Sequence, residues 1–329
     1  MRLAGLMLAT AFLAAEDGDT KPDPNAAFGM VRVVDEWGKP IPEAELHVQR
    51  FELRAPGSGP GVGRGVPKTN HCDAAGQCRV ELPPAVNDGN LTASKAGYYD
   101  SWGGHDVVSI LENLVPGPGN PPITLWLMKK LDPVPMVARH IEHLAIPALS
   151  VPLGFDLERG AWVAPQGQGV VADLIFTVGK NVVSDTEFST TVTVTFSNPD
   201  DGIMAYLSEI DPALRTTRLD MPRTAPPEGY FPSWSKSAGH HDGMWTGNRS
   251  EDGFIFRVRS HRVDQAIDSA RYGWIIGDIG IDPGNSNEAN GIRLTFAYLL
   301  NADPHSISLE WDGTNPVPDG DPQKLRYNP

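Results

Sequence analysis

Two adjacent histidines followed by an aspartate form the densest group of candidate metal ligands in the chain: His240, His241 and Asp242. Two imidazoles and a carboxylate could bind zinc or iron if a residue distant in the sequence completed the coordination. Neighbouring side chains on a strand point to opposite faces, so both histidines could reach one ion only from an irregular loop. The simpler interpretation is a solvated loop with two titratable histidines.

Aromatic side chains surround this group, and we expect the segment 226–247 to be a loop outside the sheets because turn-forming residues punctuate it. Tyrosine and tryptophan on the loops of a rigid sandwich can stack on sugar rings. The alternative is that these side chains cover the hydrophobic core. The candidate ligand-binding residues are Tyr230, Trp234 and Trp245.

The two tryptophans have different neighbours in the sequence. Trp234 lies between Ser233 and Ser235, which predicts an exposed side chain. Trp245 follows Met244 and leads toward an apolar strand, which predicts a buried side chain.

A second group of oxygen ligands lies in the segment 282–288, whose sequence is DPGNSNE. Calcium binds several oxygens in flexible loops of extracellular modules, although this spacing differs from that of the EF-hand. A turn rich in Asp and Asn is the simpler interpretation. A divalent metal, calcium here or zinc at the histidines, is the one type of cofactor that the sequence suggests.

The sequence contains no recognisable catalytic motif. A Gly-x-Ser-x-Gly elbow, a Walker loop and a Gly-x-Gly-x-x-Gly motif after a strand are all missing. Arg257 and Arg259 alternate with apolar residues and are expected on one face of a strand, where they could clamp a carboxylate or a phosphate. Internal salt bridges are the simpler interpretation in a chain with a net charge of −14.

β-Strands must position most of these residues, because apolar and polar residues alternate with period two in many segments. The clearest examples are 44–51, 189–196 and 253–259. The 34 glycines and 30 prolines favour many turns and few long helices. Two segments suggest helices: 136–146, which lies between prolines and would place His140 and His143 on one face, and 265–273.

We therefore predict an all-β protein of two β-sandwich domains with little helix. The first sandwich spans 28–130, a linker spans 131–150, and the second, an antiparallel or jelly-roll-like sandwich, spans 151–329. A β-sandwich of this kind needs short strands and frequent turns, which both halves supply.

The beginning of the chain predicts export. Residues 1–15 contain a positive charge followed by a short apolar run, a pattern typical of a signal peptide, and 16–27 form a polar lead. We expect a secreted or periplasmic protein in which Cys72 and Cys78, separated by a turn, form a disulfide. No later segment is long and apolar enough to span a membrane, and the negative charge argues against nucleic acid as a partner.

Residues 28–130 resemble a known module. The motif runs from Gly29 through alternating valines, Asp35, Gly38 and Pro40-Ile41 to Val48. A second turn around Gly76 and the strand 91–98 that ends in Lys-Ala-Gly-Tyr are also similar to the transthyretin-like, or carboxypeptidase regulatory-like, domain. The resemblance implies an accessory, non-catalytic β-sandwich.

The second half resembles uncharacterised exported bacterial proteins, and no activity comes with that resemblance. It rests on short segments such as 162–169, 256–259 and 298–301. The resulting hypothesis is an exported, non-catalytic binding or structural protein that recognises a glycan or a cell-surface partner. The alternatives are a metal-dependent hydrolase with its site at the histidine group, and a subunit of an envelope assembly that uses exposed sheet edges.

Overall fold

The computed structural model describes residues 28–53, 62–64, 68–81, 89–101, 123–207, 219, 221–242, 244–247, 253–285 and 291–326. These residues form strands, turns and irregular segments but no helix, which confirms the all-β prediction. No element in these ranges is a helix that could cross a membrane. The predicted signal peptide and lead, 1–27, lie outside the described residues.

The first set of strands builds two four-stranded sheets. One sheet has the order β5-β1-β8-β7, and in the other β2 pairs with β3, β4 and β6. The bounds are β1 Phe28–Asp35, β2 Glu45–Leu53, β3 Val62–Arg64, β4 Lys68–His71, β5 Gln77–Glu81, β6 Gly89–Ser94, β7 Tyr98–Tyr99 and β8 Ile123–Lys129.

The two sheets of this set enclose one hydrophobic core. Alternate residues of β1 and β8 on one side and of β2 and β6 on the other are buried, as period-two alternation requires. The core includes Val31, Val33, Leu46, Val48, Leu91, Leu125 and Leu127.

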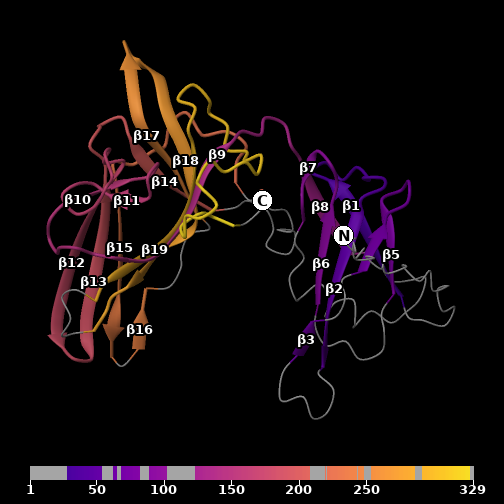
Figure 1. The fold of residues 1–329 in the computed structure, drawn as a ribbon, viewed down its shortest axis with the longest axis horizontal. Coiled ribbons are helices and arrows are strands. Elements are labelled where there is room, and N and C mark those ends of the chain that lie inside the picture. Colours follow the sequence, from indigo (N-terminus) through magenta and orange to yellow (C-terminus); the bar gives the residue numbers. More distant parts are fainter. Residues whose placement is uncertain are drawn as a thin grey trace, which may run out of the picture.

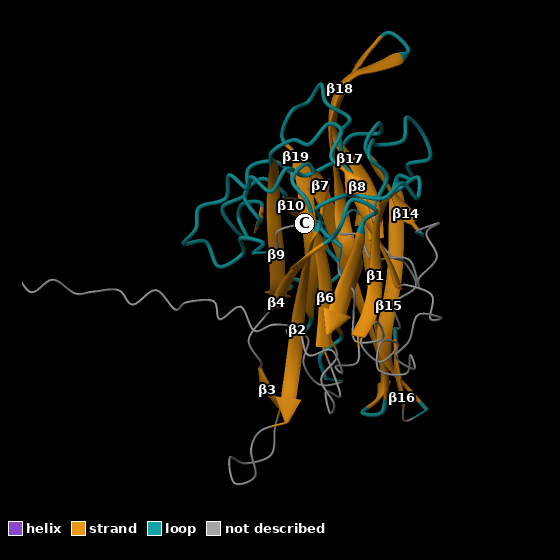
Figure 2. Cartoon of the chain, turned by 90° about the vertical axis from the view of Figure 1, so that its right-hand side faces the viewer, coloured by secondary structure: helices purple, strands orange, loops and turns teal. Residues whose placement is uncertain are grey.

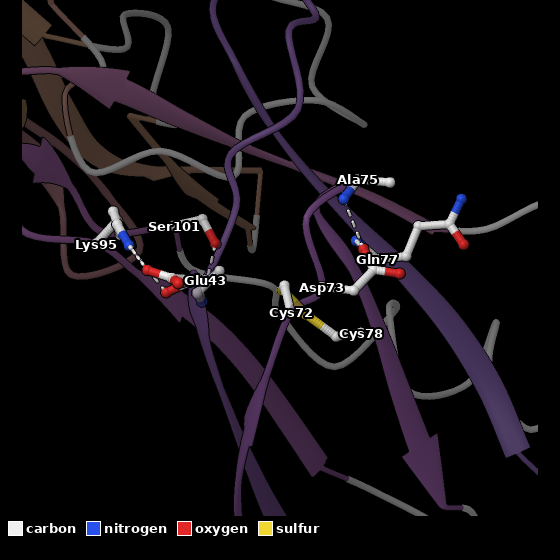
Figure 3. Close-up of a disulfide and its surroundings, with 9 residues drawn as sticks. Glu43, Cys72, Asp73, Ala75, Gln77, Cys78, Lys95 and Ser101 are labelled. Atoms are coloured by element: carbon white, nitrogen blue, oxygen red, sulfur yellow. Dashed lines mark hydrogen bonds and ion pairs between the residues drawn. A yellow bond between two sulfur atoms is a disulfide. The ribbon is translucent and has the colours of Figure 1, made fainter.

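Cys72 and Cys78 form a disulfide across the turn between β4 and β5, with their Cα atoms 4.3 Å apart. Figure 3 shows the carboxylate that organises this turn: Oδ1 of Asp73 accepts hydrogen bonds from the backbone N–H groups of Ala75 at 2.8 Å and Gln77 at 2.9 Å. Both sulfur-bearing side chains are buried in the core of the first set of strands. The disulfide therefore links a surface turn to that core.

The second set of strands builds a six-stranded sheet, β11-β10-β12-β13-β15-β16, and a five-stranded sheet, β14-β17-β18-β19-β9. Figure 1 shows this set beside the first one. The bounds are β9 Met136–Ala145, β10 Leu153–Asp156, β11 Ala161–Trp162, β12 Leu174–Ser184, β13 Glu187–Thr195, β14 Gly202–Tyr206, β15 Ser233–His241, β16 Met244–Thr246, β17 Gly253–Val263, β18 Ala266–Asp282 and β19 Arg293–Asn301.

The five-stranded sheet is covered on both faces. One face packs against the six-stranded sheet around Phe155, Phe176, Phe256 and Phe296. The opposite face packs Ile255, Trp274 and Leu299 against Leu309, Trp311 and Leu325 from the C-terminal segment. Figure 2 shows the long hairpin of β17 and β18 projecting beyond the other strands.

The two segments predicted as helices are strands. All of 136–146 except its last residue forms β9, which pairs antiparallel with β19, and 265–273 lie almost entirely in β18. Met136 and Ala138 are buried on one face of the sheet, and Val137 and Ile141 on the other. Because both faces are covered, the polar–apolar alternation that marks a strand is lost.

The segment 226–247 is also not a loop outside the sheets. Most of it forms β15 and β16, and β15 pairs with β13 over eight consecutive positions from Phe188–His240 to Thr195–Ser233. The cross-strand hydroxyl pairs Thr191–Ser237 and Thr193–Ser235, at 2.7 and 2.9 Å, lie on the outward face of this pair. Ser235 and Ser237 therefore lie on the solvent face of a strand, although the sequence suggested that the residues of this segment form turns.

Arg223 joins the two sets of strands. Its Nη2 bonds Glu36 at 2.7 Å, and its Nη1 bonds the carboxylate of Glu310 and, at 2.6 Å, the carbonyl oxygen of Lys129. Glu310, whose side chain is buried, also accepts the backbone N–H of Leu131 at 2.9 Å. This ionic bridge holds the end of β8 against the C-terminal segment.

Candidate functional site

The histidines of the predicted metal site point in different directions because both lie on β15. His240 Nδ1 lies 2.7 Å from the carbonyl oxygen of Thr186, and its ring stacks on Phe188 with centroids 6.1 Å apart. His241 Nδ1 instead bonds the carboxylate of Glu187. The two imidazoles therefore do not face a common point.

A different trio converges at the same end of the sheet: Glu187, His241 and Asp242, each with a ligand atom within 4.8 Å of the others. His241 Nε2 lies 3.4 Å from Oδ2 of Asp242. One imidazole nitrogen and two carboxylates are a ligand set suited to zinc, and the carboxylates also suit calcium. The sequence missed Glu187 because only the β13–β15 register, which pairs Phe188 with His240, places it beside His241.

The contacts of His241 predict its pH dependence. Its pKa is raised, first by the hydrogen bond to Glu187 and then by the charges of Asp242 and Glu187. A raised folded-state pKa means that the protonated ring stabilises the fold. This contribution is fully present below the unfolded pKa of about 6.5 and is lost as the pH rises through the folded value.

We expect an NMR titration of His241 to show a midpoint above that of free histidine, and Glu187→Gln to lower that midpoint. Glu142→Gln, which removes an exposed carboxylate outside this group, is the control and should leave the midpoint in place. Added zinc should suppress the titration, because a metal-bound imidazole is deprotonated. Equal midpoints in the wild type and Glu187→Gln would contradict this account.

The three aromatic candidates lie in different environments. Trp234 packs edge-on against Phe254, with ring centroids 5.0 Å apart, and is a partly buried side chain at the border of the core between the two large sheets. Trp245 is 65% exposed and touches only the edges of Phe188 and His240 among the described rings. This is the reverse of the burial predicted from the residues that flank the two tryptophans.

Tyr230 lines a groove of about 710 Å³ on the face of the five-stranded sheet that points away from the six-stranded sheet. Glu228, Arg257, Arg262, Gln265 and Tyr272 contribute to the same groove. Tyr230 is held there by Tyr272, with ring centroids 6.4 Å apart, and by the Arg257 guanidinium, 4.6 Å above the Tyr230 ring. We refer to this feature as the Tyr230 groove.

The Arg257 guanidinium donates its hydrogen bonds to backbone carbonyls and not to a carboxylate. Its Nε and Nη2 donate to the backbone carbonyl of Asp200 at 2.9 and 2.6 Å, and its Nη1 donates to that of Pro227 at 3.3 Å. The Asp200 carboxylate is instead paired with Arg262. Within the described residues, no carboxylate lies within ion-pair distance of Arg257.

The phenol of Tyr230 is also unpaired. Its oxygen is buried without a hydrogen-bond partner in the described part of the chain. Burial raises the pKa of Tyr230 well above its usual value, and the neighbouring Tyr272 acts in the same direction while Arg257 opposes it. The phenol therefore stays protonated at neutral pH and can donate a hydrogen bond.

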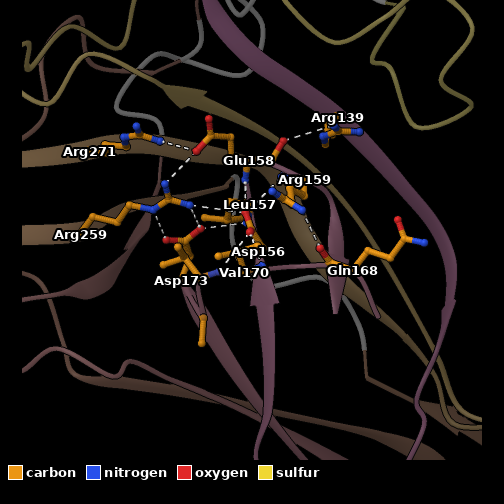
Figure 4. A network of polar contacts seen from close by, with 12 residues as sticks. Arg139, Asp156, Leu157, Glu158, Arg159, Gln168, Val170, Asp173, Arg259 and Arg271 are labelled. Atoms are coloured by element: carbon orange, nitrogen blue, oxygen red, sulfur yellow. Dashed lines mark hydrogen bonds and ion pairs between the residues drawn. The ribbon is translucent and has the colours of Figure 1, made fainter. Parts of the chain in front are cut away.

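Arg259 differs from Arg257, because each of its three side-chain nitrogens donates a hydrogen bond to a carboxylate (Figure 4). Its Nε and Nη2 bond the two oxygens of Asp173 at 2.7 and 2.9 Å, and its Nη1 bonds Glu158 at 2.8 Å. Burial raises the pKa of Asp173 although Arg259 opposes the shift, and the hydrogen bond to Asp173 raises the pKa of Arg259. This network is an internal structural element, as the acidic composition suggested.

The two arginines do not share the face that period-two alternation predicted. The register of β17 against β18 shifts after Val258, and Arg259 has a positive φ of 55°. Asp201 stabilises this irregularity by accepting the N–H groups of Arg259 at 3.0 Å and Ser260 at 2.9 Å. The bulge separates Arg259 from Arg257, so they cannot clamp one anion together.

The predicted calcium segment is described only in part. Asp282 Oδ1 accepts the N–H of Gly284 at 3.0 Å, which is the Asx turn that the sequence suggested. Residues 286–290 lie outside the described residues. The structure therefore describes the candidate calcium ligands of this segment only as far as Asn285.

Comparison of the chain with protein families, with curated proteins and with solved structures found no match. The resemblance of residues 28–130 to the transthyretin-like domain stays a prediction. The function proposed below therefore depends on the chemistry of the Tyr230 groove.

Proposed function

We propose that this chain is an exported, non-catalytic binding protein that recognises a glycan bearing an anionic group in the Tyr230 groove. Export is supported by the composition of residues 1–15 and by the disulfide between Cys72 and Cys78. The accessory role that the transthyretin-like resemblance implies for 28–130 agrees with a binding function.

The observation that carries the proposal is the state of Arg257. A guanidinium without a carboxylate partner, fixed by two backbone carbonyls beside a groove, is preorganised to bind a carboxylate or sulfate. Gln265 provides a further hydrogen-bonding group, and the apolar parts of Tyr230, Tyr272 and Ile267 line the same groove. Concave sites with few, well-placed polar groups are typical of ligand-binding pockets.

Glu228 restricts the charge that a ligand of this groove can carry. Its exposed carboxylate lies in the same groove and repels a second negative charge. A ligand with one anionic group directed at Arg257 and hydroxyls elsewhere fits this arrangement better than a polyanion. An acidic sugar residue within an otherwise neutral glycan has this chemistry.

The experiment is calorimetric titration of the protein with methyl galacturonide, a sugar with a single carboxylate, and with neutral malto-oligosaccharides. We expect methyl galacturonide to bind, and Arg257→Met to weaken that binding by about tenfold or more, since a charge-assisted hydrogen bond contributes on the order of 1.5–3 kcal/mol. Arg159→Met, which removes an arginine that donates to Gln168 elsewhere, is the charge-matched control. Absence of binding, or equal weakening by both substitutions, would reject the proposal.

A metal-dependent hydrolase is the second candidate, and the trio Glu187, His241 and Asp242 is the observation that favours it. Catalytic zinc uses three protein ligands and keeps a position for water, whose pKa the metal lowers. The zinc titration of His241 described above distinguishes this candidate from glycan binding, because it leaves the Tyr230 groove untouched.

A further inference from the structure

A second recess, separate from the Tyr230 groove, lies where the two large sheets meet. It has a volume of about 480 Å³, and its lining includes Lys236, Ile276, Asp278, Ile281 and Thr295. Lys236 comes from β15 of the six-stranded sheet, and Asp278 comes from β18 of the five-stranded sheet. We call this feature the Lys236–Asp278 recess.

The local backbone explains how a carboxylate reaches this position. The register of β18 against β19 shifts between Ile276 and Gly280, and Gly277 has a positive φ of 66°. This irregularity lies within an otherwise apolar stretch of β18, in which Ile275 and Ile279 are buried in the core. In a regular strand, period-two alternation alone would decide which face the Asp278 side chain occupies. The bulge interrupts this alternation, and Asp278 contacts Lys236 on the other sheet.

The ion pair in the recess is buried and incomplete. Lys236 Nζ bonds Oδ2 of Asp278, and the two side chains are only 12% and 9% exposed. Oδ1 of Asp278 is buried and has no hydrogen-bond partner among the residues that the structure describes. Lys236 uses one of its three N–H donors on Asp278.

Stability does not explain this arrangement. A buried ion pair is often no more stabilising than an apolar pair of similar volume, because both charges lose their hydration. A buried carboxylate oxygen without a donor adds a further cost, and buried polar atoms in folded proteins almost always have a partner. Because Asp278 lines the recess, its unpaired acceptor points to a donor supplied from outside the chain.

The charges in the recess select the class of ligand. An anion drawn to Lys236 would meet the carboxylate of Asp278, and a cation drawn to Asp278 would meet the ammonium of Lys236. A neutral molecule with a donor and an acceptor on adjacent atoms avoids both conflicts. One hydroxyl of a vicinal diol can donate to Oδ1 of Asp278 while the next accepts from Lys236 Nζ.

We propose that the Lys236–Asp278 recess binds a neutral monosaccharide unit through two adjacent hydroxyls. Its volume is within the range of small-molecule sites. Ile276, which is 38% exposed, and the half-buried Ile281 offer apolar surface for the C–H face of a pyranose ring. This site is independent of Arg257 and takes a ligand of different charge.

The test uses the methyl glycosides of glucose, mannose and galactose, titrated into isotopically labelled protein and followed by NMR. We expect at least one glycoside to shift the backbone signals around Lys236 and Asp278, and tetrahydropyran, which has the ring but no hydroxyls, to leave them unchanged. This mapping needs no variant. Shifts confined to the Tyr230 groove, or no shift with any glycoside, would overturn the proposal.

Substitution gives a second measure. The double variant Lys236→Gln/Asp278→Asn keeps the shape of the pair but removes both charges, and we expect it to weaken glycoside binding by about tenfold or more. Thr191→Val/Ser237→Ala, which breaks a hydroxyl pair on the outward face of β13 and β15, is the matched control and should bind as the wild type does. Unchanged affinity in the folded double variant would contradict the proposed role of the pair, whatever the methyl galacturonide titration shows.

Discussion

Replacing Arg259 with methionine is expected to lower the free energy of unfolding by about 3–5 kcal/mol, the range found when one partner of a buried ion pair is removed. The reason is Asp173, whose side chain is 0% exposed. Arg259 neutralises it with two parallel hydrogen bonds, and the backbone N–H of Leu157 provides a further one at 2.9 Å. Methionine fills a similar volume but leaves this carboxylate charged and buried.

The loss should depend on pH. Burial already raises the pKa of Asp173 in the folded protein, and removal of Arg259 raises it further because the opposing charge is gone. An acid with a raised folded-state pKa destabilises the fold as the pH rises from its unfolded pKa, about 3.9, toward the folded value. The difference between the wild type and Arg259→Met should therefore be largest near neutral pH and should shrink below about pH 4.

Denaturant unfolding of both proteins at neutral and acidic pH measures this difference. Arg262→Met is the matched control: it makes the same substitution on the same strand, in an ion pair with Asp200 that is open to water. Its effect should be much smaller, because exposed ion pairs contribute little to stability. Equal losses in the two variants, or a loss for Arg259→Met that does not change with pH, would show that Asp173 is not the cause.

The sequence was informative where one face of a strand is buried and the other is in water. Residues 189–196 alternate apolar and hydroxyl side chains, and the structure places them almost entirely in β13. Residues 253–259 lie at the start of β17. The pattern failed for 136–146, because both faces of the sheet are covered there and a short apolar run does not distinguish a strand from a helix.

The candidate sites were less predictable than the fold because their residues meet only through strand register. Glu187 lies beside His241, and Asp278 beside Lys236, although the residues of each pair are 54 and 42 positions apart, respectively, in the sequence. Bulges also could not be predicted from the sequence, because no residue around Arg259 signals the positive φ that turns it away from Arg257. Tyr230 could be selected as a candidate because it is one of the aromatic residues of 226–247. The burial of its phenol oxygen without a partner among the described residues could not be predicted.

The tryptophans show the same limit and give the second large effect. Trp234→Ala is expected to lower the free energy of unfolding by about 3 kcal/mol, at the lower end of the range for truncating a buried tryptophan, because its indole is only partly buried. Its ring packs against Phe254 in the core between the two large sheets. Loss of the indole leaves a cavity beside Phe254 that the surrounding strands cannot close.

Trp245→Ala is the comparison, because Trp245 is 65% exposed at the edge strand β16. We expect this substitution to change stability by about 0.5 kcal/mol or less, as is usual for surface positions. Thermal and denaturant unfolding of the two variants measure both quantities, and tryptophan fluorescence gives an independent readout, since the exposed indole should be the more accessible to a soluble quencher. A larger loss for Trp245→Ala than for Trp234→Ala would reverse the assignment and restore the burial that the flanking serines and methionine predict.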